Sequence, residues 1–199
     1  MNHREYFDKQ AKYWDSKMKV DLRTLQRVVG AAGIKEKDMV LDVGTGTGIL
    51  LPSLSKATGK EGKVFALDIS GEMLVKARSK KISENIRYIQ ADVEQFPFFN
   101  EIFSHVICFA AFPHFLNKRK ALAEISRVLR KGGKLVIAHA AGRETINARH
   151  RELGGILAED QIPEEEKMKK LFRDANFFKL KIVDEADFYM AEGLKNGKK

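Results

Sequence analysis

Three glycines at alternate positions, Gly44, Gly46 and Gly48, follow directly after the largely apolar run 40–43. An apolar stretch with the pattern of a helix starts immediately after them. Glycines in such a loop allow positive φ angles and let a ligand approach the main chain. The N–H groups at the start of the following helix would point at that ligand. The stretch therefore predicts a ligand-binding loop between a strand and a helix.

A carboxylate at Asp68 narrows the kind of ligand. It ends a second predicted strand, 63–68, about twenty residues after the loop, where a βαβ unit places an acid for ribose hydroxyls. An adenosine-containing cofactor is the first expectation. A dinucleotide fingerprint would need Gly or Ala at the position of Ile49, and a Walker loop would need Lys and then Ser or Thr after the last glycine. Both of those loops are therefore disfavoured.

The elements that must position this loop alternate regularly. The predicted strands are 40–43, 63–68, 86–90, 103–109 and 134–138, with helical patterns between them. Such alternation predicts a parallel, doubly wound α/β sheet. Two further β-patterned runs, 177–183 and 187–191, lie too close in sequence for a parallel crossover and are expected to pair antiparallel.

The remaining segments flank this core. Residues 5–19 carry Tyr6, Phe7, Tyr13 and Trp14 at helical spacing, which fits either a lid over the ligand or a helix packed on the sheet edge. Pro163 is expected to open a helix that runs to Ala175. We expect a single domain 1–199, divided into N-terminal helices and lid 1–33, a cofactor-binding core 38–139, a polar substrate-side segment 140–162, and a helix with a closing hairpin 163–199.

Composition limits the function classes. A chain of 199 residues with 44% hydrophobic content suits one α/β domain. Its net charge of +9 is spread along the predicted helices, and only Lys195, Lys198 and Lys199 gather, in an expected solvent-exposed tail. No basic stretch is interleaved with aromatic residues, so nucleic-acid binding is disfavoured.

The single cysteine and the absence of long apolar runs favour a cytoplasmic location. Cys108 lies in an apolar run, which excludes a disulfide framework and favours a buried strand residue over a nucleophile. No apolar run approaches the ~18–20 residues of a membrane span, and the N-terminus leads into no signal-peptide core.

The pattern Asp42-x-Gly44-x-Gly46-x-Gly48, followed by Asp68, resembles motifs I and II of the class I S-adenosylmethionine-dependent methyltransferases. Residues 121–135 are similar to the post-motif helix of the small-molecule, ubiquinone/menaquinone-type members of that family, although Lys131 stands where they commonly have Pro. The resemblance implies a seven-stranded Rossmann-like sheet of five parallel strands closed by a C-terminal antiparallel hairpin.

The resemblance also implies the cofactor, S-adenosyl-L-methionine, and the side chains that hold it. Asp42 and the loop glycines would line its methionine part, Asp68 would bind the ribose hydroxyls, and Asp92 would meet the adenine amine. Ile69 and Met73 would pack on the adenine ring. The full set assigned to the cofactor is Tyr13, Asp42, Gly44, Thr45, Gly46, Gly48, Asp68, Ile69, Met73, Asp92, Val93 and Phe109.

The acceptor of the methyl group is expected to be a small molecule. The end of the fourth predicted strand, 110–113, reads Ala-Ala-Phe-Pro and lacks the Asn/Asp-Pro-Pro-aromatic motif of the base and protein-amide N-methyltransferases. Two alternatives stay open. One is an RNA or protein methyltransferase, which rests on charge alone. The other is a nucleotide-cofactor-binding module without methyl transfer or a nicotinamide enzyme of similar sheet, which Ile49 and the two closing strands disfavour.

Three histidines, His114, His139 and His150, are expected at the carboxyl edge of the sheet, where open α/β sheets bind ligands. They could serve separate surface or capping roles, act as a base or orienting group for the acceptor, or bind a metal. No metal site is expected, because no cysteine or close histidine pair supports one. We expect His139 and His150 to face the acceptor, and Arg143 to hold an anionic part of it through a two-pronged ion pair.

Overall fold

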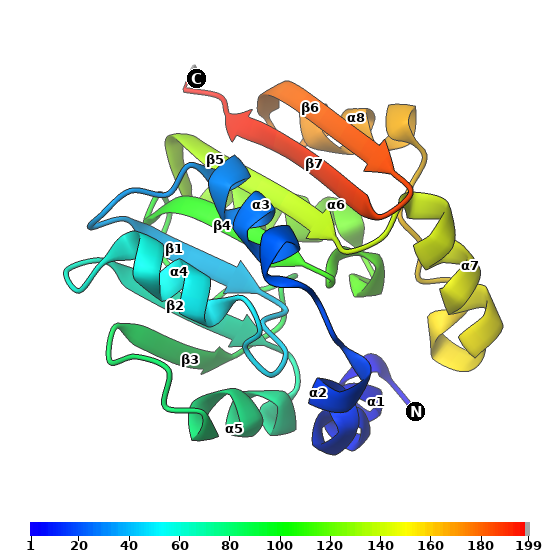
Figure 1. Ribbon diagram of the computed structural model, residues 1–199. Coiled ribbons are helices and arrows are strands. Elements are labelled where there is room, and N and C mark those ends of the chain that lie inside the picture. The colour runs from blue at the N-terminus through cyan, green and yellow to red at the C-terminus, as the bar shows by residue number, and fades with distance from the viewer. Residues whose placement is uncertain (198–199) are drawn as a thin grey trace.

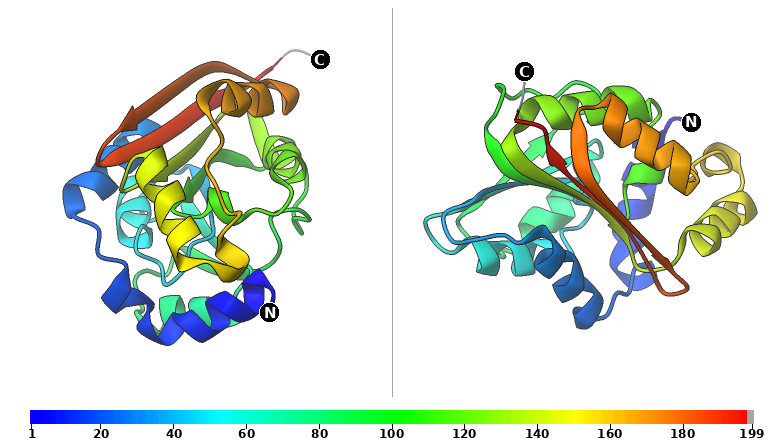
Figure 2. Two further views of the ribbon diagram at one scale, coloured as in Figure 1. Left: turned by 90° about the vertical axis from the view of Figure 1, so that its right-hand side faces the viewer. Right: turned by 90° about the horizontal axis from the view of Figure 1, so that it is seen from above.

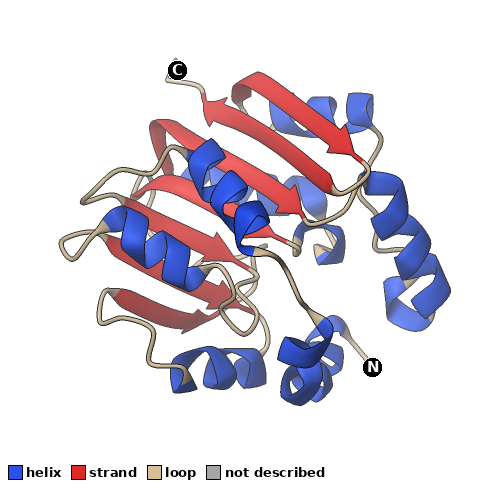
Figure 3. Ribbon diagram, in the orientation of Figure 1, coloured by secondary structure: helices blue, strands red, loops and turns tan. Residues whose placement is uncertain are grey.

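The computed structural model describes residues 1–197, which form one seven-stranded sheet in the order β3-β2-β1-β4-β5-β7-β6 (Figures 1 and 3). Among β1 to β5, the strands that are adjacent in the sheet pair parallel. β7 pairs antiparallel with both β5 and β6. The expected fold class is confirmed. The strands are β1 Met39–Val43, β2 Lys63–Asp68, β3 Ile86–Gln90, β4 Phe103–Phe109, β5 Leu129–His139, β6 Phe177–Glu185 and β7 Phe188–Lys195.

Helices cover both faces of the sheet and create two apolar cores. On one face, α3 (Leu22–Ala32), α4 (Leu51–Thr58) and α5 (Gly71–Ser79) contribute buried side chains to one cluster. On the other face, α6 (Lys118–Val128) and α8 (Glu165–Asp174) contribute to the second. With both faces covered, the edge formed by the carboxyl ends of the parallel strands is left for a ligand.

The N-terminal segment and α7 flank that edge. The segment consists of α1 (His3–Gln10), the short turn Ala11–Tyr13 and α2 (Trp14–Lys17). It lies on the side toward which the parallel strands point, as does α7 (Arg143–Leu153) (Figures 1 and 2). Ser70 caps α5 as its position in the sequence suggests, since its hydroxyl accepts the N–H of Met73.

Several boundaries differ from the sequence expectation. The segment expected to be merely polar contains α7 and a 3₁₀ turn, Gly155–Leu157, and α8 begins at Glu165 rather than at Pro163. β5 begins at Leu129, five residues before the expected start at Lys134. Strand pairing explains this extension, because Phe103 of β4 pairs with Leu129 before the register shifts.

The expected exposed basic tail is wrong for Lys195. That residue lies on β7 and is buried, and its Nζ donates to the carbonyl of Leu129 at 2.7 Å. The hairpin extends four residues further than its apolar pattern, which carries Lys195 into the sheet. Lys198 and Lys199 lie outside the described residues. Cys108 is fully buried on β4, as expected. Among residues 1–197, no helix has the length and apolar character needed to span a bilayer.

Candidate active site

The glycine loop takes the conformation that its sequence predicts. Gly44, Gly46 and Gly48 have φ angles of +72°, +56° and +83°, which favour glycine. The N–H groups of Gly44 and Thr45 donate to the carbonyl of Leu67 at 2.8 and 3.0 Å, which fixes the loop on the end of β2. A Cβ atom at Gly44 would overlap the Cβ of Ala111, so the main chain passes too close to β4 for any side chain.

Asp68 lies at the end of β2 and faces the glycine loop. One carboxylate oxygen accepts the N–H of Gly46 at 2.8 Å and the other accepts the N–H of Ser70 at 2.9 Å. Burial raises the pKa of Asp68 to about 6, although these two N–H groups favour the charged form. Each oxygen keeps a further lone pair, so the carboxylate can still accept the two hydroxyls of a ribose.

Asp42 and Gly48 lie behind the loop and not on the ligand side. Asp42 is buried, accepts the hydroxyl of Thr45 at 2.7 Å, and has a pKa that burial raises to about 7. A Cβ at Gly48 would lie 2.8 Å from Leu51 and 3.3 Å from Ala77, so this glycine permits helix packing. Both residues therefore shape the loop, and neither lines the cavity beside it. Their expected contact with the cofactor stays a prediction.

A cavity of about 940 Å³, here called the loop cavity, opens between this loop and the N-terminal segment. Nine of the residues that the sequence assigned to a cofactor line it: Gly44, Thr45, Gly46, Asp68, Ile69, Met73, Asp92, Val93 and Phe109. His114, one of the three histidines expected at the acceptor, lines it as well. The structure thus gathers most of the expected set around one space.

Tyr13 is placed away from this cavity. Its side chain is 52% exposed and its ring lies under the Nζ of Lys12, whereas the adjacent Trp14 lines the cavity. Neighbouring residues on a helical turn point about 100° apart, so only one of the two can face inward. Periodicity could not decide which one, because both are aromatic.

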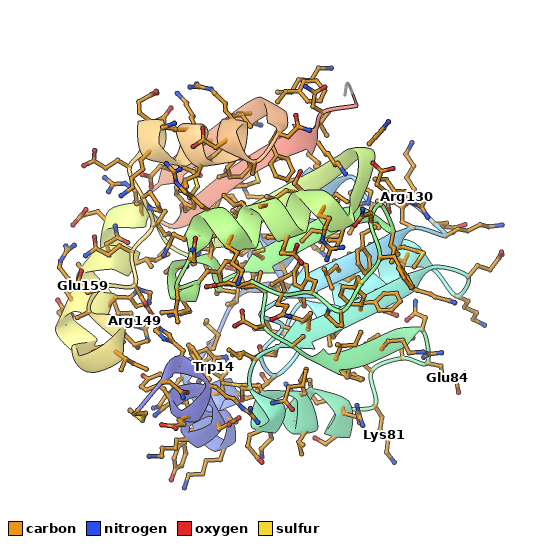
Figure 4. All side chains as sticks on the ribbon, turned by 180° about the vertical axis from the view of Figure 1, so that it is seen from behind. Trp14, Lys81, Glu84, Arg130, Arg149 and Glu159 are labelled. Carbon is orange, nitrogen blue, oxygen red and sulfur yellow. The ribbon has the colours of Figure 1, made fainter. Side chains whose placement is uncertain are left out.

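A second cavity of about 980 Å³, here called the histidine cavity, lies beside the first. His139, His150 and Arg149 line it, together with apolar side chains of the N-terminal segment and α7. Trp14 and Arg149 come from these two facing parts of the chain (Figure 4). The residues that line both cavities are Phe7, Trp14, Met18, Phe109, Ala110 and His114. The two spaces therefore share a wall at the end of β4.

His139 presents an unpaired polar atom at this cavity. It is buried at the end of β5, and its Nε2 has no hydrogen-bond partner within residues 1–197. Burial, with the nearby His114 and His150, lowers the pKa of His139 to about 3. The imidazole is therefore neutral at physiological pH. The hydroxyl of Tyr189, whose ring centroid lies 6.3 Å from that of His139, is likewise buried without a partner in the described part of the chain.

Arg143 lies outside both cavities. Its main-chain N–H donates to Asp184 at 2.8 Å, and its guanidinium Nε lies 3.5 Å from the same carboxylate. The pairing with β6 holds this side chain against the closing hairpin. The sequence did not single out Arg149, which lines the histidine cavity, and its only signal was its place in the same polar segment.

His3 and Asp160 form a partly buried cluster with His114 that the sequence did not indicate. Nε2 of His3 and Nδ1 of His114 lie 2.8 and 2.7 Å from the same carboxylate oxygen of Asp160. Nδ1 of His150 is bonded to the main-chain carbonyl of Asp160. Because His3 and Asp160 are 157 positions apart, no local pattern could have paired them.

Comparison with known proteins agrees with this geometry. Residues 41–137 match the family model of a methyltransferase domain. The ubiquinone/menaquinone biosynthesis C-methyltransferase UbiE of Wigglesworthia glossinidia brevipalpis is 42% identical over 102 residues, which cover 49% of this chain and 41% of that protein. UbiE of Pectobacterium atrosepticum is 34% identical over 113 residues, 55% of this chain and 45% of that protein. The matched segment thus spans less than half the length of these curated relatives.

Solved structures share the fold over almost the whole chain. A SAM-dependent methyltransferase from Aquifex aeolicus has a TM-score of 0.75 at 24% identity, and the match covers 94% of this chain and 97% of that one. Phosphoethanolamine N-methyltransferase 2 of Haemonchus contortus, in complex with S-adenosyl-L-methionine, has a TM-score of 0.79 at 14% identity, covering 98% of this chain and 58% of that one. The resemblance drawn from the glycine loop and Asp68 is confirmed.

Proposed function

We propose that this chain is a class I S-adenosylmethionine-dependent methyltransferase that transfers a methyl group from that cofactor to a small molecule bound in the histidine cavity. The observation that carries the proposal is the wall shared by the two cavities, formed by Phe109, Ala110 and His114 among others. A cofactor in one space and an acceptor in the other would meet there, in the close alignment that displacement at carbon requires.

The loop cavity fits S-adenosylmethionine, which when bound supplies a methyl group activated on a sulfonium centre. Asp68 would accept the ribose hydroxyls while its other lone pairs keep the loop in place. Ile69 and Met73 lie on the wall where an adenine ring would pack, and Asp92 lies on the same wall. The close approach at Gly44 leaves the main chain itself as the surface beside the methionine part.

The lining of the histidine cavity favours an apolar, ring-sized acceptor that carries an anionic or hydroxyl group. Most of its side chains are apolar or aromatic, and its cations are Lys17 and Arg149. We assign the pairing with an anionic group to Arg149, since Arg143 faces Asp184. The names of the curated relatives, which place them in ubiquinone and menaquinone biosynthesis, agree with an acceptor of this kind.

His139 would orient the acceptor and would not take its proton. A base with a pKa of about 3 holds a proton poorly at neutral pH, whereas an unpaired Nε2 is a good hydrogen-bond partner for an acceptor hydroxyl. The division of the domain into lid, core, substrate-side segment and hairpin, and a cytoplasmic location, are further parts of this proposal.

The cofactor half of the proposal is tested by calorimetry with S-adenosylhomocysteine. We expect Asp68→Asn to weaken binding about 10-fold or more, which is about 1.4 kcal/mol of lost charge-assisted bonding to the ribose. Asp187→Asn, an exposed acid in the β6–β7 turn, is the matched control and should bind as the wild type does. Equal affinity in both variants would remove the assignment of Asp68, and a preference for NADH would remove the methyltransferase proposal.

The acceptor half is tested by methyl transfer from labelled cofactor to a panel of phenols, quinols and aromatic carboxylates. We expect His139→Gln to lose turnover while it binds S-adenosylhomocysteine normally, and His105→Ala, at the opposite end of β4, to retain turnover. Label that appears in RNA or protein, and in none of the small molecules, would favour the alternative class of acceptor. Full turnover in His139→Gln would leave that residue with a packing role.

A further inference from the structure

We propose that His3, His114 and Asp160, the histidine–aspartate cluster, bind one divalent transition-metal ion of the zinc type. One ligand atom from each residue lies within 4.8 Å of the other two. The three residues come from α1, from the turn Phe112–His114 after β4, and from the segment after the turn Gly155–Leu157. The fold alone brings these ligands together.

The donor set fits such an ion. Two imidazole nitrogens and one carboxylate are a common three-ligand set for zinc that keeps a further position open. The present separations of 2.8 and 2.7 Å between each imidazole nitrogen and the carboxylate are those of hydrogen bonds. Two ligands about 2.0 Å from a tetrahedral zinc ion lie roughly 3.3 Å apart, so the cluster must open by about half an ångström.

Asp160 is also a buried carboxylate that lacks a permanent positive partner. It is 5% exposed, and within residues 1–197 its ion-pair partners are His3 and His114, with no lysine or arginine in contact. A buried charge is costly unless it is paired, and an imidazole supplies a charge only when protonated. A divalent cation bound by Asp160 would supply that positive partner.

The ligands are held in place by α7. His150 bonds the main-chain carbonyl of Asp160, and Asn147 exchanges two hydrogen bonds with the main chain of Ile162, at 3.0 and 2.8 Å. Asn147 is buried, so this support does not depend on solvent. The carboxylate of Asp160 is therefore presented from a fixed main chain, as a preformed metal site requires.

The site lies between the two cavities. His3 and His114 line the loop cavity, and His114 also lines the histidine cavity. An ion held there would fasten α1 to the segment that follows α7. Its open position could also hold a donor atom of the acceptor, a consequence that rests on the proposed function, whereas ion binding itself does not.

The test is calorimetric titration of the tag-free full chain with Zn²⁺ alone, after removal of bound metal by chelation. We expect one equivalent to bind, and Co²⁺ to bind in its place with a visible absorption that reports the ligand field. His114→Ala and Asp160→Asn should weaken binding about 10-fold or more. The matched control is His105→Ala, which removes a second histidine–carboxylate pair, with Asp38 at 3.3 Å near the start of β4, and should bind zinc as the wild type does.

Thermal unfolding in chelator checks that each variant is folded, and His3→Ala, at the start of α1, removes a ligand without touching the core. A wild type that takes up no zinc, or variants of all three ligands that bind it unchanged, would overturn the proposal. Titration of the same samples with S-adenosylhomocysteine separates the two ideas. A wild type that binds S-adenosylhomocysteine but no zinc would overturn the metal site and leave the proposed function standing. A wild type that binds no S-adenosylhomocysteine would count against the proposed function, whatever its zinc binding.

Discussion

Asp68 shows how a single residue prepares the loop cavity before any ligand arrives. Its two oxygens already accept the N–H groups of Gly46 and Ser70, so the loop and the start of α5 are fixed around the place that we propose for the ribose. A ligand that replaces solvent at the remaining lone pairs need not reorganise the main chain. Preorganisation of this kind lowers the cost of binding.

At the same scale, Gly44→Ala is expected to damage the loop more than Gly132→Ala does. Both glycines have a φ of +72°, and at Gly132 a Cβ would meet nothing within 4 Å, whereas at Gly44 it would overlap Ala111. The strain of positive φ, of order 1 kcal/mol, is common to both variants. The additional loss of unfolding free energy in Gly44→Ala therefore measures how closely the loop approaches Ala111, just after β4.

Urea unfolding and S-adenosylhomocysteine calorimetry of these two variants check this prediction. Gly132→Ala should keep wild-type affinity for the ligand, and Gly44→Ala should bind it at least about 10-fold more weakly. Similar stability and affinity in the two variants would mean that the loop moves aside at little cost.

Among the elements, the N-terminal segment is tied to the rest of the chain by polar contacts. Asp8 accepts the hydroxyl of Ser70 at 2.6 Å, Asp15 pairs with Lys80 at 3.0 Å, and His3 reaches Asp160. None of the residues of α1 is buried. Such an element opens at low free energy, because few apolar contacts are lost when it moves.

We therefore expect residues 3–17 to exchange their amide hydrogens faster without ligand than with S-adenosylhomocysteine bound. The reason is that Phe7 and Trp14, which line the loop cavity, can be fully covered only when that cavity is filled. Hydrogen exchange followed by mass spectrometry measures it, with α3 as the internal control because its residues line neither cavity. Identical protection of residues 3–17 in both states would make the segment a permanent packing element and not a lid.

In the whole molecule, function and stability oppose each other at the two buried acids. Burial raises the pKa of Asp42 to about 7 and that of Asp68 to about 6. A nearby carboxylate adds to each shift, Asp68 for Asp42 and Asp8 for Asp68. Between about pH 4 and pH 7 the folded chain keeps protons that the unfolded chain releases. These two groups therefore lower the free energy of unfolding as the pH rises through that range.

The neutral His139 acts in the opposite direction, because its lowered pKa makes the unfolded chain bind the extra proton at low pH. A variant isolates the contribution of one acid. We expect Asp42→Asn to gain roughly 1–3 kcal/mol of stability relative to the wild type on going from pH 5 to pH 8. Urea unfolding at both pH values measures it, with Asp187→Asn as the exposed control. A difference that does not change with pH would show that folding does not raise the pKa of Asp42.

The sequence by itself determined the sheet and the loop at which we expect the cofactor. The glycine loop, Asp68, and the alternation of strands and helices are patterns within about one βαβ unit, where local geometry leaves few choices. The two final strands could be paired because their separation permits only a hairpin. The structure confirms the fold that these features predicted, and it places Ile69, Met73 and Asp92 on the wall of one cavity.

Tertiary structure alone decided which side chains complete the site. Tyr13 and Trp14 are adjacent aromatic residues, and Arg143 and Arg149 belong to one polar segment, so the sequence does not distinguish the members of either pair. Packing against distant elements places Trp14 and Arg149 at the cavities. Arg143 instead pairs with Asp184 on β6, outside both cavities. Contacts between residues far apart in the chain leave no local pattern, because either partner alone is compatible with many surroundings. For that reason the cluster of His3 with Asp160 could be seen only in the folded chain.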